Sequence, residues 1–122
     1  MKKKIPCKLW IQKESNQKKI EMLKRFSNVM SDPNKVRIIM LLDQYNQDPD
    51  QSTKVSEYEN LYVSDLSEHL GMSVSAVSHS LKQLLLLGFI HKERMGRQAI
   101  YNVTDYGRSL LKTADLLTSS IT

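Results

Sequence analysis

Hydroxyl groups, an imidazole and an ammonium group crowd residues 71–84, which read GMSVSAVSHSLKQL. Ser75, Ser78, His79 and Lys82 recur at spacings of three and four residues, which on a helix places them on neighbouring rows of one surface. Hydroxyls and imidazole nitrogens can bond to base edges, and a lysine ammonium can neutralise a phosphate. The stretch therefore predicts a surface that reads duplex DNA, provided that the rest of the chain holds it as a helix.

The same stretch carries the signals of a helix with one buried side. Ser73 is suited to cap the first turn, and Gly88 supplies a residue that ends the helix. An apolar stripe is expected to face the core, and it consists of Val74, Val77, Leu81, Leu84 and Leu85. The opposite side then presents the predicted DNA-binding residues of this helix, which are Ser73, Ser75, Ala76, Ser78, His79 and Lys82.

The flanking segments predict a helix-turn-helix followed by a wing. Ser64 is expected to cap a short helix that carries Leu66 and Leu70, and Gly71 lies in the turn that follows. Residues 89–94 and 99–103 have strand character around a cationic tip at 95–98. Three further DNA-binding residues are predicted in this hairpin: Arg94, Arg97 and Gln98. The fold class is accordingly a mostly α winged helix-turn-helix with a small β-hairpin (α+β), expected to be dimeric.

The first half of the chain predicts two amphipathic helices and a polar loop. Residues 17–30 form the first helix, and residues 33–44 form the second, which Asp32 caps and Pro33 opens. Four apolar residues of the second helix are expected to point inward, namely Val36, Ile39, Met40 and Leu42. The acidic and polar residues 43–60 predict a surface loop. We divide the chain into a basic N-terminal arm, 1–16, and a winged helix-turn-helix domain, 17–122, with dimerisation helices at both ends.

The last helix carries an apolar stripe that needs a partner. It is expected to begin after Thr104, and its stripe repeats at coiled-coil-like spacing. Together with two residues of the first helix, this stripe gives the predicted dimerisation residues: Leu23, Phe26, Leu110, Ala114, Leu117 and Ile121.

The composition indicates the size of the domain and the cell compartment in which it works. The chain has 122 residues, enough for one core, with 25% charged residues and a formal net charge of +5. No apolar run is long enough to span a bilayer, and the basic N-terminus lacks the pattern of a signal peptide. The single cysteine excludes an internal disulfide, so we expect a cytoplasmic protein with no membrane partner.

The chain resembles the ArsR/SmtB-type winged helix-turn-helix transcriptional repressors. The resemblance covers residues 24–111 and rests on FSNVMSDP at 26–33, VRII at 36–39, VSDL at 63–66, SVSAVSHSL at 73–81 and GRQAIY at 96–101. It implies a homodimeric repressor that binds an inverted-repeat operator in double-stranded DNA and leaves it when a signal arrives. It also implies that Ser75, Ser78 and His79 contact DNA, while Arg94 and Arg97 place the wing against the backbone or minor groove.

The chain departs from the family pattern at the positions that bind a metal signal in metal-sensing members. Tyr62 and Ser64 stand where metal-sensing members carry two cysteines, and the last helix contains Asp105 and Asp115 but no histidine. We therefore expect no metal site and no cofactor. Cys7 is a candidate redox site, although an exposed thiol without a resolving partner is the simpler interpretation.

Three other classes of function compete with this interpretation. The sequence has no phosphate-binding glycine loop and no paired acid and base, which disfavours an enzyme. A winged helix used for protein contact remains open, and salt-dependent duplex binding would distinguish it from a DNA reader. A third possibility keeps DNA binding but replaces the metal signal with a small organic ligand or with oxidation of Cys7.

Overall fold

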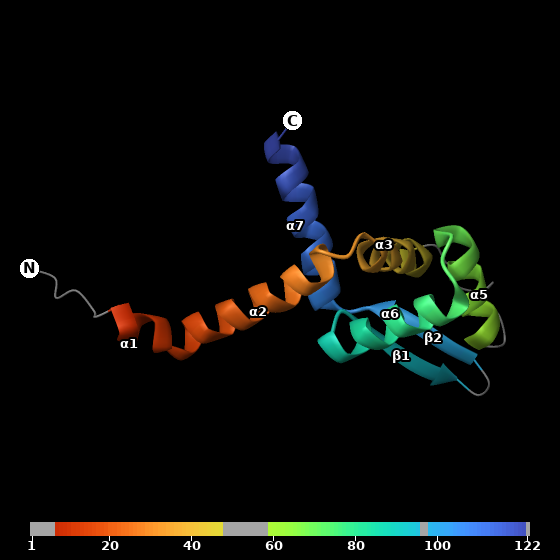
Figure 1. Cartoon of the computed structure of the whole chain (residues 1–122), viewed down its shortest axis with the longest axis horizontal. Coiled ribbons are helices and arrows are strands. Elements are labelled where there is room, and N and C mark those ends of the chain that lie inside the picture. The colour runs from red at the N-terminus through yellow and green to blue at the C-terminus, as the bar shows by residue number, and fades with distance from the viewer. Residues whose placement is uncertain (1–6, 48–58, 96–97, 122) are drawn as a thin grey trace, which may run out of the picture.

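The computed structural model describes residues 7–47, 59–95 and 98–121 (Figure 1). Its elements in chain order are α1 (Cys7–Gln12), α2 (Glu14–Met30), α3 (Pro33–Gln47), α5 (Glu59–Leu70), α6 (Val74–Leu87), β1 (Ile90–Met95), β2 (Gln98–Val103) and α7 (Asp105–Ile121). This is a mostly helical fold with one antiparallel hairpin, so the predicted fold class is confirmed. The predicted loop at 43–60 begins later than expected, because α3 runs to Gln47, and residues 48–58 lie outside the described part of the chain.

The N-terminal helices project from the body of the molecule (Figure 1). The predicted helix at 17–30 is longer than expected, because α2 already begins at Glu14, and Lys13 separates it from the short helix α1. Ion pairs between Glu14 and Lys18 and between Glu21 and Arg25, each four residues apart, line the exposed surface of α2. The division at residue 16 stays a prediction, and it cuts through the first turn of α2.

Side-chain caps start three helices where the sequence predicts them. Asp32 accepts a bond from the Asn34 amide at 3.1 Å, and the Ser73 hydroxyl accepts one from the Ala76 amide at 3.1 Å. Thr104 starts α7 by accepting a bond from the Gly107 amide at 3.1 Å. The prediction that Ser64 caps a helix is wrong, because α5 begins at Glu59 and encloses Ser64.

Two glycines allow the chain to turn tightly on either side of α6. Gly71 has φ of 63° between α5 and α6, and Gly88 has φ of 84° where α6 ends. Both values lie in the left-handed region that side chains disfavour. The hairpin follows at once, and its register pairs Ile90 with Val103 and Lys92 with Tyr101. Because β2 leads directly into α7, the hairpin joins the helix-turn-helix to the C-terminal helix.

The core lies between α3, α5, α6, the hairpin and the start of α7. Its fully buried large side chains are Phe89, Ile38, Ile39, Leu42, Leu66, Leu81, Leu84, Ile90, Leu110, Val29 and Val77. Two residues predicted to face inward do not, since Met40 is 56% exposed and Val74 is 48% exposed. The buried row of α3 instead runs through Ile38, Ile39 and Leu42, so Met40 falls one residue outside it. Val74 lies in the first turn of α6, beyond the edge of the core.

Three aromatic rings pack α2 against the base of the hairpin and the start of α7. Phe89 stacks on Tyr106 with ring centroids 4.6 Å apart, and Phe26 lies 5.1 Å from Tyr106 and 5.7 Å from Phe89. Such pairs stabilise packing beyond the area that they bury. Within the ranges that the structure describes, no helix has both the length and the apolar character needed to cross a membrane.

Candidate nucleic-acid interface

Helix α6 turns one face into the core and leaves the opposite face open. Its buried residues are Val77, Ser80, Leu81 and Leu84. Five of the six DNA-binding residues predicted on this helix are exposed, namely Ser73, Ser75, Ser78, His79 and Lys82, whereas Ala76 is half-buried. The Ser73 hydroxyl is occupied by its bond to the Ala76 amide, so Ser73 and Ala76 set the start of the helix. Ser75, Ser78, His79 and Lys82 remain as the side chains that can meet a partner.

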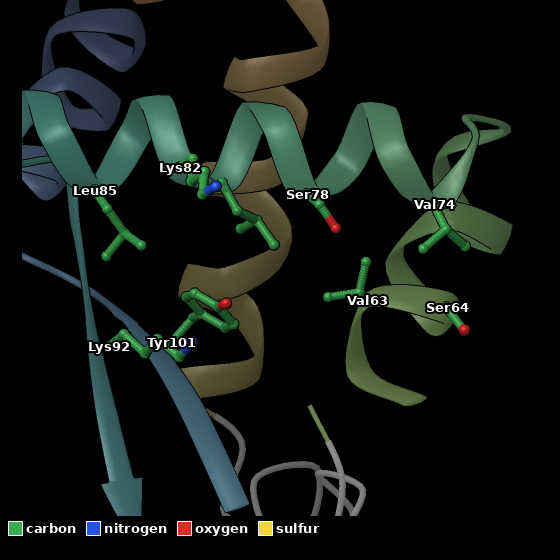
Figure 2. A pocket seen from close by; sticks show the side chains of 9 residues that line it. Val63, Ser64, Val74, Ser78, Lys82, Leu85, Lys92 and Tyr101 are labelled. Carbon is green, nitrogen blue, oxygen red and sulfur yellow. The ribbon is translucent and has the colours of Figure 1, made fainter. Parts of the chain in front are cut away.

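A hollow of about 350 Å³ opens beside this exposed face (Figure 2). Its walls come from α5, α6 and the hairpin, and the lining residues are Val63, Ser64, Val74, Ser78, Leu81, Lys82, Leu85, Lys92 and Tyr101. Figure 2 shows Ser78 and Leu85 reaching from α6 towards the space in which Val63 and the Tyr101 ring lie. The Lys92 ammonium lies 5.7 Å from the centroid of the Tyr101 ring, within the range of a cation–π contact. The hollow thus has an apolar floor with hydroxyl and ammonium groups around it.

The two faces of β1 differ in charge. Lys92 lines the hollow, and the alternation of side chains along a strand places Arg94 on the same face. The other face carries His91 and Glu93, whose Nε2 and Oε1 atoms are 3.2 Å apart. The hairpin therefore directs its cationic side towards α6. Of the other predicted wing residues, Gln98 opens β2 opposite Met95, and Arg97 lies outside the described residues.

Sequence reasoning assigned two of the nine lining residues, Ser78 and Lys82, to the site and missed the other seven. Val63, Lys92 and Tyr101 come from three different elements, and Val74 was assigned to the core. One signal could have found two of them. The hairpin register makes Lys92 and Tyr101 direct cross-strand partners, and that register can be counted from the pairing of Met95 with Gln98.

Burial raises the pKa of two tyrosines near the framework of the site. Burial is the main cause for Tyr45 on α3, and the nearby Asp65 carboxylate raises its pKa further. Burial also raises the pKa of Tyr106, while Arg25 lowers it and Glu21 raises it to smaller extents. Both phenols are therefore neutral at physiological pH and act as packing and hydrogen-bonding groups. Tyr106 donates its hydroxyl to the carbonyl oxygen of Met22 at 3.3 Å.

The part of the chain that the structure describes contains no candidate metal site. No three histidine, cysteine, aspartate or glutamate residues gather there in a way that could hold an ion. Ser64, at one of the family's two cysteine positions, and its neighbour Asp65 are both exposed on α5. Cys7 is also exposed, on the first turn of α1.

Exposed apolar side chains gather on the two helices predicted to dimerise. On α7, Leu117 is 55% exposed and Ile121 is 85% exposed, with Ala114 and Leu116 also on the surface. On α2, Leu23 is 65% exposed and borders a shallow groove lined by Ile20, Leu23, Lys24, Ser27, Asn28 and Ser31. The other two predicted contacts are placed differently. Leu110 is buried in the protomer's own core, and Phe26 is half-buried against Phe89 and Tyr106, because both lie where α2 and α7 meet the hairpin.

Comparison with known proteins matches both the sequence and the fold. The family model of the bacterial regulatory proteins of the arsR family matches residues 53–92. The HTH-type transcriptional regulator NmtR of Mycobacterium tuberculosis is 47% identical over 45 residues, which are 37% of this chain and only 38% of NmtR.

A solved structure matches the whole chain in fold. It is the solution NMR structure of a homodimeric winged helix-turn-helix DNA-binding domain from Mycobacterium bovis, described as a possible ArsR-family transcriptional regulator. The match has a TM-score of 0.61 and covers 100% of this chain and 94% of that chain, at 15% identity. At this identity the match shows the fold alone, which is a winged helix-turn-helix. The resemblance inferred from the sequence is thereby confirmed: residues 53–92 match the arsR-family model, and the whole chain matches a winged helix-turn-helix fold.

Proposed function

We propose that this protein is a homodimeric, sequence-specific repressor that acts in the cytoplasm on an inverted-repeat operator. The observation that carries the proposal is the exposed polar face of α6 beside a hairpin whose cationic side faces it. A helix with short polar side chains near its start can approach base edges closely, and flanking cations neutralise phosphates.

Each side chain of the interface has a role that follows from its chemistry. Ser75, Ser78 and His79 bond to base edges or phosphates from the first half of α6. Val74, exposed at the rim of the hollow, offers an apolar contact for a thymine methyl group. Cationic groups are proposed to hold the DNA backbone, and these are Lys82, Lys92, Arg94 and Arg97, with Gln98 at the wing tip.

Dimerisation through α2 and α7 completes the proposed function. Leu23 on α2 and Ala114, Leu117 and Ile121 on α7 are exposed apolar residues, and exposed apolar surface often marks an interaction site. A two-fold dimer would present two copies of α6 to successive major grooves about 34–36 Å apart. The operator is then a palindrome that mirrors the symmetry of the protein.

The signal that releases the operator is proposed not to be a metal bound by the family's cysteine pair. The positions of that pair hold Tyr62 and Ser64, which supply no thiolate. Oxidation of the exposed Cys7 or a small organic ligand remains the alternative, and both can be tested in the same binding experiment.

A gel-shift assay with the DNA directly upstream of the protein's own gene tests the proposal. The full chain should bind this duplex selectively, with affinity falling steeply as salt rises. The double variant Ser78→Ala/His79→Ala should bind roughly tenfold or more weakly while its thermal unfolding is unchanged. Repeating the assay with zinc, and with reduced and oxidised protein, identifies the class of signal.

The matched control changes the same residue types elsewhere. Ser109 lies on α7, and His91 lies on the hairpin face opposite Lys92, so Ser109→Ala/His91→Ala should bind like the wild type. Equal loss in both double variants would contradict the assignment of α6 as the reading helix. Absence of selective binding by the wild type would favour a winged helix used for protein contact.

A further inference from the structure

One asparagine ties the last turn of α3 to the outer edge of β2. The Asn46 Oδ1 atom accepts a bond from the Val103 amide at 3.1 Å. Its Nδ2 atom donates to the Asn102 Oδ1 atom at 2.8 Å and to the Tyr101 carbonyl oxygen at 3.4 Å. A single side chain therefore bonds to three consecutive residues of the strand.

The pattern of these bonds imitates a neighbouring strand. In a β-ladder, a residue on a parallel neighbour accepts from one amide and donates to a carbonyl two residues away. The Asn46 carboxamide does this with the Val103 amide and the Tyr101 carbonyl, whose groups lie on the edge of β2 that β1 leaves open. Asn46 therefore satisfies backbone groups that a strand edge otherwise exposes.

The position of β2 matters because the helices, and not a larger sheet, hold the hairpin in place. A sheet of two strands is marginal in isolation, so contacts with the helices set its position. Tyr101 is 5% exposed and supports Lys92 across the pair, and both residues line the hollow beside Ser78 and Lys82. A displacement of β2 would thus change the distance between the cationic face of the wing and α6.

We infer that Asn46 is a positioning residue for the wing, setting the hairpin at the distance from α6 that duplex DNA requires, without touching the DNA itself. This inference rests on the proposed function for its consequence, although the position of the hairpin can be measured without DNA. Sequence alone gives no sign of this role, because an asparagine in a polar helix end is normally a solvated residue.

The variant Asn46→Leu tests the inference, because it keeps the branched shape of the side chain and removes all three bonds. Its control is Gln44→Leu, which changes an exposed amide on the same helix two residues earlier. Binding to the upstream duplex is measured across a salt series, well below the unfolding temperature of each variant. Hydrogen exchange of the hairpin amides, Val103 above all, is measured on the free proteins.

We expect Asn46→Leu to bind DNA roughly tenfold more weakly, with a salt slope lower by about one to two, because the cations of the wing lose their phosphates. Exchange should rise in β1 and β2 but not in α6. A role in stability alone would lower the unfolding temperature yet leave the affinity and slope of the folded protein unchanged, which would overturn the inference. Normal binding and normal hairpin exchange in Asn46→Leu would overturn it equally.

Two further outcomes are decisive as well. If Asn46→Leu does not fold, Asn46→Asp replaces it, because aspartate keeps the acceptor for the Val103 amide and loses both donated bonds. The same loss of affinity and salt slope is expected there, and wild-type behaviour would overturn the inference. If the wild type binds no duplex, the proposed function fails, and hairpin exchange alone then decides whether Asn46 positions the wing.

Discussion

Replacing Gly107 with alanine should destabilise the protein, although the same change usually stabilises a helix. Gly107 lies in the first turn of α7 and is buried against the base of the hairpin. A Cβ atom there would meet the Phe89 carbonyl oxygen at 2.3 Å and the Val103 Cγ1 atom at 2.7 Å. An ordinary carbon–oxygen contact is about 3.3 Å or longer, so α7 would have to move by about 1 Å.

The neighbouring atoms cannot easily give way. The Phe89 carbonyl oxygen already accepts a bond from the Thr104 amide at 3.1 Å, and the Val103 side chain is 3% exposed. Overpacking of this kind costs about 1–3 kcal/mol, and a clash with backbone favours the upper end of that range. Alanine regains about 1 kcal/mol relative to glycine in a helix, which leaves a net loss of about 2 kcal/mol.

Urea unfolding of Gly107→Ala, followed by circular dichroism, measures this loss. The midpoint should fall while the slope of unfolding free energy against urea stays constant, and Tm should drop by roughly 5–10 °C. The control Ser109→Ala changes an exposed residue of the same helix and should stay within about 0.5 kcal/mol of the wild type. A Gly107→Ala protein as stable as the wild type, or more stable, would refute the close packing of α7 on the hairpin.

Three other substitutions test separate parts of the account. Ser73→Ala removes the cap of α6 and should cost about 1 kcal/mol in urea unfolding, whereas Ser73→Asp should restore most of the loss. Leu117→Asp places a charge on the exposed stripe of α7 and should give a monomer by analytical ultracentrifugation at concentrations where the wild type is a dimer. An unchanged dimer would remove that stripe from the interface. Lys82→Gln should lower the salt slope of DNA binding by about one, and an unchanged slope would show that Lys82 contacts no phosphate.

Where a capping side chain or a glycine marks the end of a helix, local signals in the sequence predicted that end, because they depend on neighbours only. The caps at Asp32, Ser73 and Thr104 and the turns at Gly71 and Gly88 are all found where the residue types place them. Each is a bond or a backbone angle that a few consecutive residues decide. The two predicted strands of the hairpin are also found, with Ile90 paired to Val103 and Met95 paired to Gln98.

The wrong predictions concern features that are set by packing between different elements. The buried row of α3 includes Lys35, which is 7% exposed and directs its ammonium to the Asn28 side chain at 3.3 Å. The aliphatic part of the Lys35 side chain packs like a hydrocarbon, so a pattern of apolar residues alone does not include Lys35 in the buried row of α3. The sequence-based prediction therefore chose a neighbouring row and wrongly placed Met40 in the core. Ser64 resembled a cap because serine is a common N-cap and the apolar residues Leu66 and Leu70 follow it, but α5 already begins at Glu59.

The polar side of the candidate site was predictable, and its shape was not. Periodicity alone placed Ser75, Ser78, His79 and Lys82 on the open face of α6. The hollow beside them requires the positions of α5 and the hairpin relative to α6, which no local pattern contains. Asn46 was missed for the same reason, because its partners lie more than fifty residues away in the chain.

The most direct test of the central claim is an NMR titration of the full chain with the duplex upstream of its gene. The account predicts that the perturbed amides cluster on residues 74–82 and on the hairpin face that includes Lys92 and Arg94, with α7 little affected. Perturbations confined to α2 and α7, or spread over the surface without preference for that face, would contradict the assignment of α6 and the wing as a DNA-reading surface.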